Sequence, residues 1–248
     1  MRVFILGIGD AFTRLHFGSS ALIEGPHGWV LLDCPDPIHR AIHEATSEHG
    51  ASIDARHIDD VIITHLHGDH CNGLESFGFW RWFSRRLGMT TTTPRLHVTA
   101  EVASRVWGKL APAMDASGDP SSPRTLADYF DLRVITPGEP SLIAGLRVET
   151  RPTRHPVPTV GVKITDSRRT LGWSGDTPFE PAHVEWLADA DLIVHETNLG
   201  PAHTPIESLN SLPDDLRRKM RLIHMVDDFD PACSDIPPLR DRELLVLE

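Results

Sequence analysis

Cysteine is scarce in this sequence, with three residues, Cys34, Cys71 and Cys233, in a chain of 248. They are few and widely spaced, which predicts neither a disulfide framework nor a CxxC zinc cluster. No apolar run reaches the roughly 18 residues of a membrane-spanning helix. The first residues enter a strand pattern at once, without the longer apolar region and small-residue cleavage site of a signal peptide. We therefore expect a cytoplasmic protein that does not insert into a membrane.

Positive charge is also in short supply. Lys and Arg total 24 against 35 Asp and Glu, which gives a formal net charge of −11 at pH 7. This balance disfavours a broad surface for the phosphate backbone of a nucleic acid. It does not exclude a small anionic substrate, because bound metal ions can reverse the local field. Hydrophobic residues make up 40% of the chain, which is enough for a sizeable core.

The pattern of apolar residues predicts two clusters of strands, each followed by helices. This arrangement is typical of two packed sheets with helices outside them, rather than of a doubly wound parallel sheet. No internal repeat or long linker divides the chain, so we expect a single domain over residues 1–248. The segment 112–123 is rich in Pro, Ser and Gly, which predicts a mobile surface loop. Strands are predicted at 3–6, 20–24, 29–33, 61–64, 96–99, 132–135, 146–150, 160–165, 170–174, 191–195 and 221–224, and helices at 38–49, 72–87, 101–110, 181–187 and 206–220.

The strongest chemical signal is an H-x-H-x-D-H motif at residues 65–70, directly after a short β-branched run that predicts a buried strand. Imidazole and carboxylate ligands together suit zinc, manganese or iron. Side chains at alternate positions of an extended chain point the same way, so His65 and His67 can bind one ion. A turn at Gly68 then lets Asp69 and His70 reach a second ion.

This motif resembles the hallmark of the metallo-β-lactamase superfamily, and the resemblance covers nearly the whole chain. It implies an α/β fold of four layers, the αββα sandwich. The segment Leu31-Leu32-Asp33-Cys34 is similar to the superfamily's early strand that ends in Asp and supports the metal loop from behind. The resemblance therefore gives Asp33 a supporting role rather than a place among the ligands.

By the same resemblance, three further ligands follow downstream, each at the end of a strand-like segment. His155 belongs to the first site, His224 to the second, and Asp176 lies between the ions. Two divalent ions about 3.5–4 Å apart can share a hydroxide nucleophile and hold the scissile group between them. We expect zinc, with manganese or iron as alternatives. The implied ligand set is His65, His67, Asp69, His70, His155, Asp176 and His224.

Two downstream motifs resemble the ribonuclease Z-like branch of the superfamily. Residues 191–197 are similar to that branch's HEAT segment, and the His-Thr pair at 203–204 is similar to its H-S/T motif. The resemblance implies that Glu196 pairs with His203, which assists the leaving group or stabilises the charged transition state. A carboxylate beside a histidine raises its pKa and keeps it protonated as a general acid. His195 is expected to be a structural residue at the end of a strand.

The chain departs from the transfer-RNA processing enzymes of that branch. Those enzymes carry a long arm between the third histidine and the bridging aspartate, whereas only 21 positions separate His155 from Asp176 here. The short interval and the negative charge argue against tRNA as a partner. The spacing is closer to a subgroup of small cyclic phosphodiesterases, although the chain lacks the cysteine-rich zinc site of that subgroup. We therefore expect a small-molecule substrate, and a homodimer is compatible with the sequence but not fixed by it.

The expected function is a metal-dependent hydrolase with a metal-bridging hydroxide, and the favoured substrate is a small or cyclic phosphate ester. Hydrolysis of a thioester, lactone or amide is the first alternative on this fold. A di-iron oxidoreductase or oxygenase is an alternative from another class. Di-iron reductases of the superfamily usually carry Glu in the motif where this chain has His67-x-Asp69-His70, which favours hydrolysis.

Aromatic and basic residues are mixed in the predicted helix at 77–87. Such a helix can stack nucleobases, contact a membrane or cover the metal site. The simpler interpretation, which we favour, is an apolar face toward the core and a basic face outward. Cys71 follows a ligand directly, but seven better ligands leave no need for its thiolate.

Overall fold

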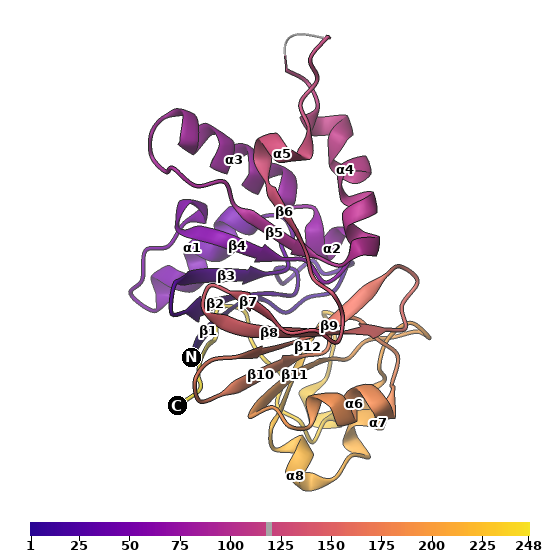
Figure 1. Cartoon of the computed structure of the whole chain (residues 1–248). Coiled ribbons are helices and arrows are strands. Elements are labelled where there is room, and N and C mark those ends of the chain that lie inside the picture. Colours follow the sequence, from indigo (N-terminus) through magenta and orange to yellow (C-terminus); the bar gives the residue numbers. More distant parts are fainter. Residues whose placement is uncertain (118–120) are drawn as a thin grey trace.

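The computed structural model describes residues 1–117 and 121–248 and shows two sheets packed face to face, with helices on the outer side of each (Figure 1). Within these residues the first sheet has seven strands in the order β13-β1-β2-β3-β4-β5-β6, and the second has six in the order β12-β11-β10-β9-β8-β7. The strands of the first sheet are β1 (Arg2–Gly7), β2 (Ser20–Gly25), β3 (Gly28–Leu32), β4 (Ile58–Ile62), β5 (Arg95–Val98), β6 (Asp131–Val134) and β13 (Leu244–Val246). Those of the second are β7 (Ser141–Ile143), β8 (Leu146–Thr153), β9 (Thr159–Thr165), β10 (Thr170–Trp173), β11 (Leu192–Glu196) and β12 (Met220–Ile223).

The helices divide between the two outer layers. Those of the amino-terminal half lie on the first sheet, and those of the carboxyl-terminal half lie on the second (Figure 1). The first group is α1 (Ile38–Glu48), α2 (Gly68–Cys71), α3 (Leu74–Arg86), α4 (Ala100–Met114) and α5 (Leu126–Tyr129), with the short 3₁₀ turn η1 (Ala55–His57). The second is α6 (Pro181–Leu187), α7 (Ile206–Asn210) and α8 (Asp214–Arg217), and a second 3₁₀ turn, η2 (Pro231–Cys233), follows β12.

The inner strands of the first sheet are buried on both faces, and β1 shows how the sequence achieves this. Successive side chains of a strand point to opposite faces. Val3 and Ile5 belong to the apolar cluster between the sheets, whereas Phe4 and Leu6 belong to the cluster beneath α1, α3 and α4. A strand buried on both sides reads as a continuous apolar run, as this one does. The two clusters fix the sheet between its neighbours.

The carboxyl ends of parallel strands position the chemistry. Strands β3 to β6 are parallel neighbours, and so are β10 to β12. In α/β sheets, ligands bind beyond the carboxyl ends of the strands. Asp33 directly follows β3, the H-x-H-x-D-H motif begins three residues after β4, Asp176 lies three residues after β10, and His224 directly follows β12. Both sheets therefore deliver functional side chains to one end of the sandwich.

Two predictions of local structure are wrong. The helix predicted at 206–220 is two short helices, α7 and α8, and Met220 already belongs to β12. Pro213 lies between them, and its missing backbone N–H and its ring are incompatible with a continuous helix. In the predicted loop 112–123, α4 continues through Pro112 to Met114, and residues 118–120 lie outside the described part. The sequence gives no sign of β7, β13 or α5, because these short elements carry no apolar pattern that sets them apart from a loop.

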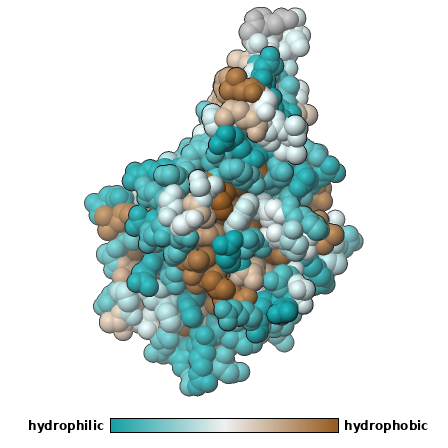
Figure 2. All heavy atoms as spheres, turned by 90° about the vertical axis from the view of Figure 1, so that its left-hand side faces the viewer, coloured by the Kyte–Doolittle hydropathy of each residue, from teal (hydrophilic) through white to brown (hydrophobic). Residues whose placement is uncertain are grey.

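The surface in Figure 2 is mostly hydrophilic, and its hydrophobic residues gather in separate patches. None of the helices in the described residues is both long and apolar enough to span a membrane. Some large hydrophobic side chains are nevertheless exposed on loops and edge strands, among them Phe12, Leu142 and Leu199.

Candidate metal centre

Asp33 fixes the base of the histidine loop. It is fully buried and adopts a left-handed backbone conformation with φ of 58°, which is uncommon for a residue other than glycine and is typical of functional sites. Its carboxylate accepts hydrogen bonds from the backbone N–H of Thr64 at 2.8 Å and from the Thr64 hydroxyl at 2.8 Å. Nδ1 of His70 lies 2.9 Å from the same carboxylate. This contact orients the His70 ring and leaves Nε2 free for a metal.

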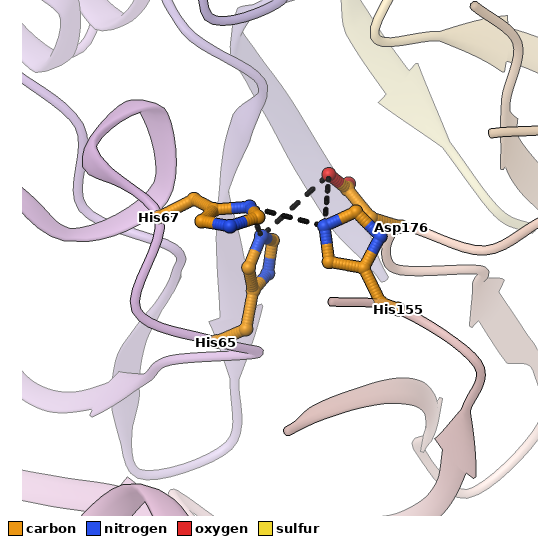
Figure 3. A group of neighbouring side chains, drawn as sticks. All are labelled: His65, His67, His155 and Asp176. Atoms are coloured by element: carbon orange, nitrogen blue, oxygen red, sulfur yellow. Dashed lines mark hydrogen bonds and ion pairs between the residues drawn. The ribbon is translucent and has the colours of Figure 1, made fainter. Parts of the chain in front are cut away.

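Four side chains form the first group, His65, His67, His155 and Asp176 (Figure 3). Nδ1 of His67 lies 3.2 Å from Nε2 of His65 and 3.0 Å from Nε2 of His155. An oxygen of Asp176 lies 3.6 Å from Nε2 of His65 and 3.7 Å from Nε2 of His155. Residues from three distant segments thus direct their ligand atoms at one point.

The second group is Asp69, His70 and His224. Nε2 of His224 lies 3.1 Å from Oδ2 of Asp69, and Nε2 of His70 lies 3.4 Å from the same oxygen. Asp176 also contacts this group, with oxygens 3.4 Å from Nε2 of His70 and 3.6 Å from Nε2 of His224. The structure therefore puts Asp176 between both groups, where a bridging carboxylate would lie.

A buried nitrogen of His70 indicates that these residues fit a cation. Nε2 of His70 is shielded from solvent and makes no hydrogen bond, although carboxylate oxygens of Asp69 and Asp176 lie 3.4 Å away. With the Nδ1 proton directed at Asp33, a neutral ring presents a lone pair at Nε2 to these oxygens. A lone pair and two carboxylates facing one another are satisfied when a positive ion lies between them. The donor set of imidazoles and carboxylates suits zinc, manganese or iron.

The protonation states of several ligands match this interpretation. Burial lowers the pKa of His65 well below its ordinary value and lowers the pKa of His155 to about 4, so both rings are neutral near pH 7. Burial opposes ionisation of Asp69, but its hydrogen bond with His224 and the nearby His70 ring outweigh burial and hold the pKa of Asp69 below the usual range. His70 differs: burial acts to lower its pKa, yet the nearby carboxylates, Asp176 first, raise it well above normal, so the neutral ring described above is the form that a bound cation would require. A bound cation competes with that proton.

Glu196 and His203 form a pair beside the two groups. Nδ1 of His203 lies 3.0 and 3.2 Å from the two oxygens of the buried Glu196 carboxylate, which also accepts the backbone N–H of Thr177 at 2.6 Å. Burial lowers the pKa of His203, but the hydrogen bond with Glu196 raises it more, and the net direction is upward. The His203 ring centroid lies 5.4 Å from that of His155 and 5.2 Å from that of His224. His203 is thus close enough to Asp176 and His224 to complete a third group that could hold a metal.

The turn that carries Asp176 requires glycine at the preceding position. Gly175 has φ of +60°, and a Cβ there would lie 2.4 Å from the carbonyl oxygen of Val160. Only glycine meets both conditions without strain. Thr153 donates its hydroxyl hydrogen bond to the Asp176 carbonyl at 2.8 Å, and this contact further fixes the turn.

The structure adds two residues that motif reasoning missed, Asp10 and Asn198. The side-chain amide of Asn198 donates to Asp10 at 3.0 Å and to the backbone carbonyl of His224 at 2.9 Å. His224 has φ of 61°, so this contact supports the strained backbone of a candidate ligand. The signal in the sequence is the place of Asn198, two residues after Glu196.

Two other residues singled out by the sequence are not part of the ligand groups. His195 is buried, and its Nδ1 lies 2.8 Å from the Glu196 carbonyl. The thiol of Cys71 donates to the carbonyl of His67 at 3.1 Å.

Helix α3 packs into the first half of the molecule. Its Phe77 ring stacks on Phe130 with centroids 6.4 Å apart. Arg81 is fully buried, pairs with Asp59 at 2.5 Å and donates to the hydroxyl of Thr92 at 2.7 Å. One arginine of this helix is therefore part of the interior, whereas the sequence favours a basic face toward solvent.

Comparison with known proteins identifies the family. The family model of the Anti-Pycsar protein Apyc1 matches residues 1–237. The chain belongs to this family. The Apyc1 protein of Paenibacillus sp. (strain J14) is 31% identical over 260 residues, which cover 100% of this chain and 99% of that protein. The cGMP-dependent 3′,5′-cGMP phosphodiesterase A of Dictyostelium discoideum is 25% identical over 201 residues, which cover 74% of this chain and 22% of that protein.

Solved structures share the fold of this Apyc1-family chain. The metallo-β-lactamase fold protein YhfI of Bacillus subtilis aligns with a TM-score of 0.80 and 17% identity over 98% of both chains. The short form of human tRNase Z aligns with a TM-score of 0.72 and 17% identity over 100% of both chains. The α/β metallo-β-lactamase fold that the motif predicts is confirmed, with two mixed sheets flanked by helices. The chain is thus a phosphodiesterase-like protein of this fold with adjoining groups of residues suited to metal ions.

Proposed function

We propose that this Apyc1-family chain is a binuclear metal-dependent phosphodiesterase that hydrolyses the 3′,5′-cyclic phosphodiester of a cyclic nucleotide. The observation that carries the proposal is the meeting of two ligand groups at Asp176, with the pair of His203 and Glu196 beside them. Support also comes from relatives in Dictyostelium discoideum that are named as cyclic-nucleotide phosphodiesterases. A cyclic nucleotide is a small anion, so it needs no broad basic surface on a chain with net charge −11.

Seven side chains would hold two divalent ions, with zinc as our first choice. When bound, the ions would activate water for attack on phosphorus and offset the negative charge of the phosphate. Asp176 has oxygens near both groups, so its carboxylate would reduce the repulsion between two dications. The proposed ligands of one ion are His65, His67 and His155, and those of the other are Asp69, His70 and His224, with Asp176 shared.

His203 would hold the proton for the leaving group. Its Nδ1 faces Glu196, so the other ring nitrogen is the one that can reach a substrate. Opening a cyclic phosphodiester releases a ribose oxygen, a poor leaving group that a general acid can protonate as the bond to phosphorus breaks. Glu196 would keep the His203 ring oriented and protonated, while the N–H of Thr177 holds the carboxylate in place. The leaving oxygen thereby takes its proton from His203 rather than departing as an alkoxide.

The test compares one protein preparation in three states: stripped with a chelator, resupplied with zinc, and resupplied with manganese. The substrates are adenosine 3′,5′-cyclic monophosphate, bis(p-nitrophenyl) phosphate, a thioester and a lactone. We expect the cyclic nucleotide to be opened to the monophosphate, with the activity lost on chelation and restored by metal. Turnover of the thioester or lactone without cleavage of either phosphodiester would overturn the proposal. An iron pair with a redox-dependent visible spectrum and no hydrolysis would favour the oxidoreductase alternative.

A further inference from the structure

Two large apolar side chains are exposed on neighbouring loops beside the ligand groups. Phe12 lies on the loop between β1 and β2 and is 88% exposed, and Leu199 lies on the loop between β11 and α7 and is 75% exposed. We propose that Phe12 and Leu199 form the surface that contacts the nucleobase of the cyclic nucleotide. This inference rests on the function proposed above and names the residues that would recognise the part of the substrate distant from phosphorus.

One hydrogen-bonded cluster ties both loops to a metal ligand. The amide of Asn198 donates to Asp10 at 3.0 Å and to the His224 carbonyl at 2.9 Å. The other oxygen of Asp10 accepts the backbone N–H of Phe12 at 2.9 Å. The amide oxygen of Asn198 accepts the backbone N–H of Leu199 at 2.6 Å. The backbone at Phe12 is therefore held by Asp10 and that at Leu199 by Asn198, and Asn198 links both to the backbone of the proposed ligand His224.

The ends of the β1–β2 loop also contact the second ligand group. A Cβ at Gly18 would lie 2.9 Å from the carbonyl oxygen of Asp69, so the loop returns directly against that ligand. At its start, Gly9 forms a β-bridge with Met225, the residue after His224. The loop thus begins and ends beside the ligand group, with Phe12 between these points.

The other loop also carries the proposed general acid. The backbone N–H of Asn198 donates to the carbonyl of Thr204 at 3.1 Å, which closes the segment that contains both Leu199 and His203. Within this closed segment, His203 faces Glu196 and the ligand groups, and Leu199 faces solvent. A substrate whose leaving oxygen meets His203 would extend the rest of its structure past this segment.

The chemistry of a nucleobase suits this surface. With the phosphate held at the buried ligand groups, the ribose and base must extend toward solvent, where the apolar side chains lie. A phenyl ring offers a flat face for stacking, and every base has a π-face, so the contact needs no positive charge from an acidic protein. Leu199 would add apolar contact at the edge of the stack. The alternative occupant is an aliphatic group of a different phosphate ester, and comparing substrates with and without a base distinguishes it from a nucleobase.

The experiment measures KM and kcat of the metal-loaded full chain for two substrates. One is adenosine 3′,5′-cyclic monophosphate, and the other is 1-O-methylribose 3′,5′-cyclic phosphate, which lacks the base. The variants are Phe12→Ala, Phe12→Trp and Leu199→Ala. Phe83→Ala and Leu142→Ala are matched controls, because Phe83 is 50% and Leu142 is 78% exposed on α3 and β7. Thermal melting checks that each variant folds.

We expect Phe12→Ala to raise KM for the cyclic nucleotide about tenfold, within the range measured for the loss of base stacking, with little change in kcat. Leu199→Ala should raise KM by a smaller factor, and Phe12→Trp should retain the wild-type KM. For the substrate without a base, none of the three substitutions should change KM. Both control variants should have the wild-type KM for both substrates.

Two outcomes overturn the inference, and they are distinguishable. If wild type cleaves the cyclic nucleotide but Phe12→Ala leaves KM unchanged, or raises it equally for the substrate without a base, the base does not contact Phe12 and the proposed function stands. If wild type cleaves bis(p-nitrophenyl) phosphate but neither cyclic phosphate, the proposed substrate fails and this inference fails with it.

Discussion

Substitution of His203 by Ala tests the role of the general acid. The ring is partly exposed, with 21% of the side chain accessible, and its contacts with Glu196 measure 3.0 and 3.2 Å. Its removal should therefore leave the fold intact. Loss of a general acid slows a reaction by about 10²–10⁴-fold, which corresponds to roughly 3–5 kcal/mol on the barrier. We expect this loss for adenosine 3′,5′-cyclic monophosphate, whose leaving ribose oxygen is strongly basic.

The assay compares two leaving groups in the same metal-loaded protein. Bis(p-nitrophenyl) phosphate releases a weakly basic nitrophenolate, which departs without a proton. His203→Ala should therefore slow this substrate by less than about tenfold, while the cyclic nucleotide suffers the full loss. His43→Ala, on the exposed face of α1, is the matched control and should behave as wild type. Metal content should not change.

A double-mutant cycle with Glu196→Gln isolates the pair. If Glu196 acts only by holding the His203 proton, each single substitution and the double substitution should slow the cyclic nucleotide to a similar degree, because the two side chains act as a unit. Equal slowing of both substrates by His203→Ala would instead assign it to charge stabilisation. Loss of one metal from His203→Ala would make it a ligand. Full activity toward both substrates would refute the assignment.

Three further predictions concern the site and the fold. Asp176→Ala should lose at least one metal and nearly all turnover, as metal analysis and kinetics would measure. A variant that keeps both metals and a near-normal rate would show that Asp176 is not the bridge. Gly175→Ala should lower the free energy of unfolding, measured in urea, by more than about 2 kcal/mol, because φ is +60° and the added Cβ would collide with the backbone of Val160. A change near zero would contradict this geometry. Asp60 accepts hydrogen bonds from Arg95 at 2.6 and 2.5 Å and lies 2.7 Å from Nε2 of His97, so Asp60→Asn should cost about 1.5–3 kcal/mol at pH 7. Burial acts to raise the Asp60 pKa, but these contacts lower it below its unfolded value of about 3.9, so the stabilisation is present above that pH and fades below it. A difference in the free energy of unfolding between wild type and Asp60→Asn that grows toward pH 3 would contradict this.

The layered fold could be predicted because its signals are local. Val61 to Thr64 is a short β-branched run, and the motif begins directly beyond it, so strand and ligands are read from one stretch of sequence. The same holds for Asp33 and His224, each directly after a strand. Short edge strands such as β7 and β13 carry no periodic pattern, because pairing with a distant strand is what forms them. The split of 206–220 into two helices could have been found from Pro213.

Only part of the candidate site, like only part of the fold, could be predicted from the sequence. The H-x-H-x-D-H motif predicts that its own residues converge, but only resemblance brings His155, Asp176 and His224 to it from far along the chain. Asn198 lies close to Glu196 in the sequence, but its contact with Asp10 joins positions 188 residues apart and could not be predicted from that closeness. The exposure of Phe12 is likewise a property of the folded loop and not of its sequence. Metal identity depends on the ions themselves, since the same ligands suit zinc, manganese and iron.

Anomalous diffraction from crystals grown with zinc, measured on both sides of the zinc absorption edge, tests the two-metal centre. We expect two peaks about 3.5–4 Å apart, with Asp176 between them. One should be bound by His65, His67 and His155, and the other by Asp69, His70 and His224. A single peak, peaks bound by other residues, or no peak in zinc-supplemented crystals would contradict the two-metal centre.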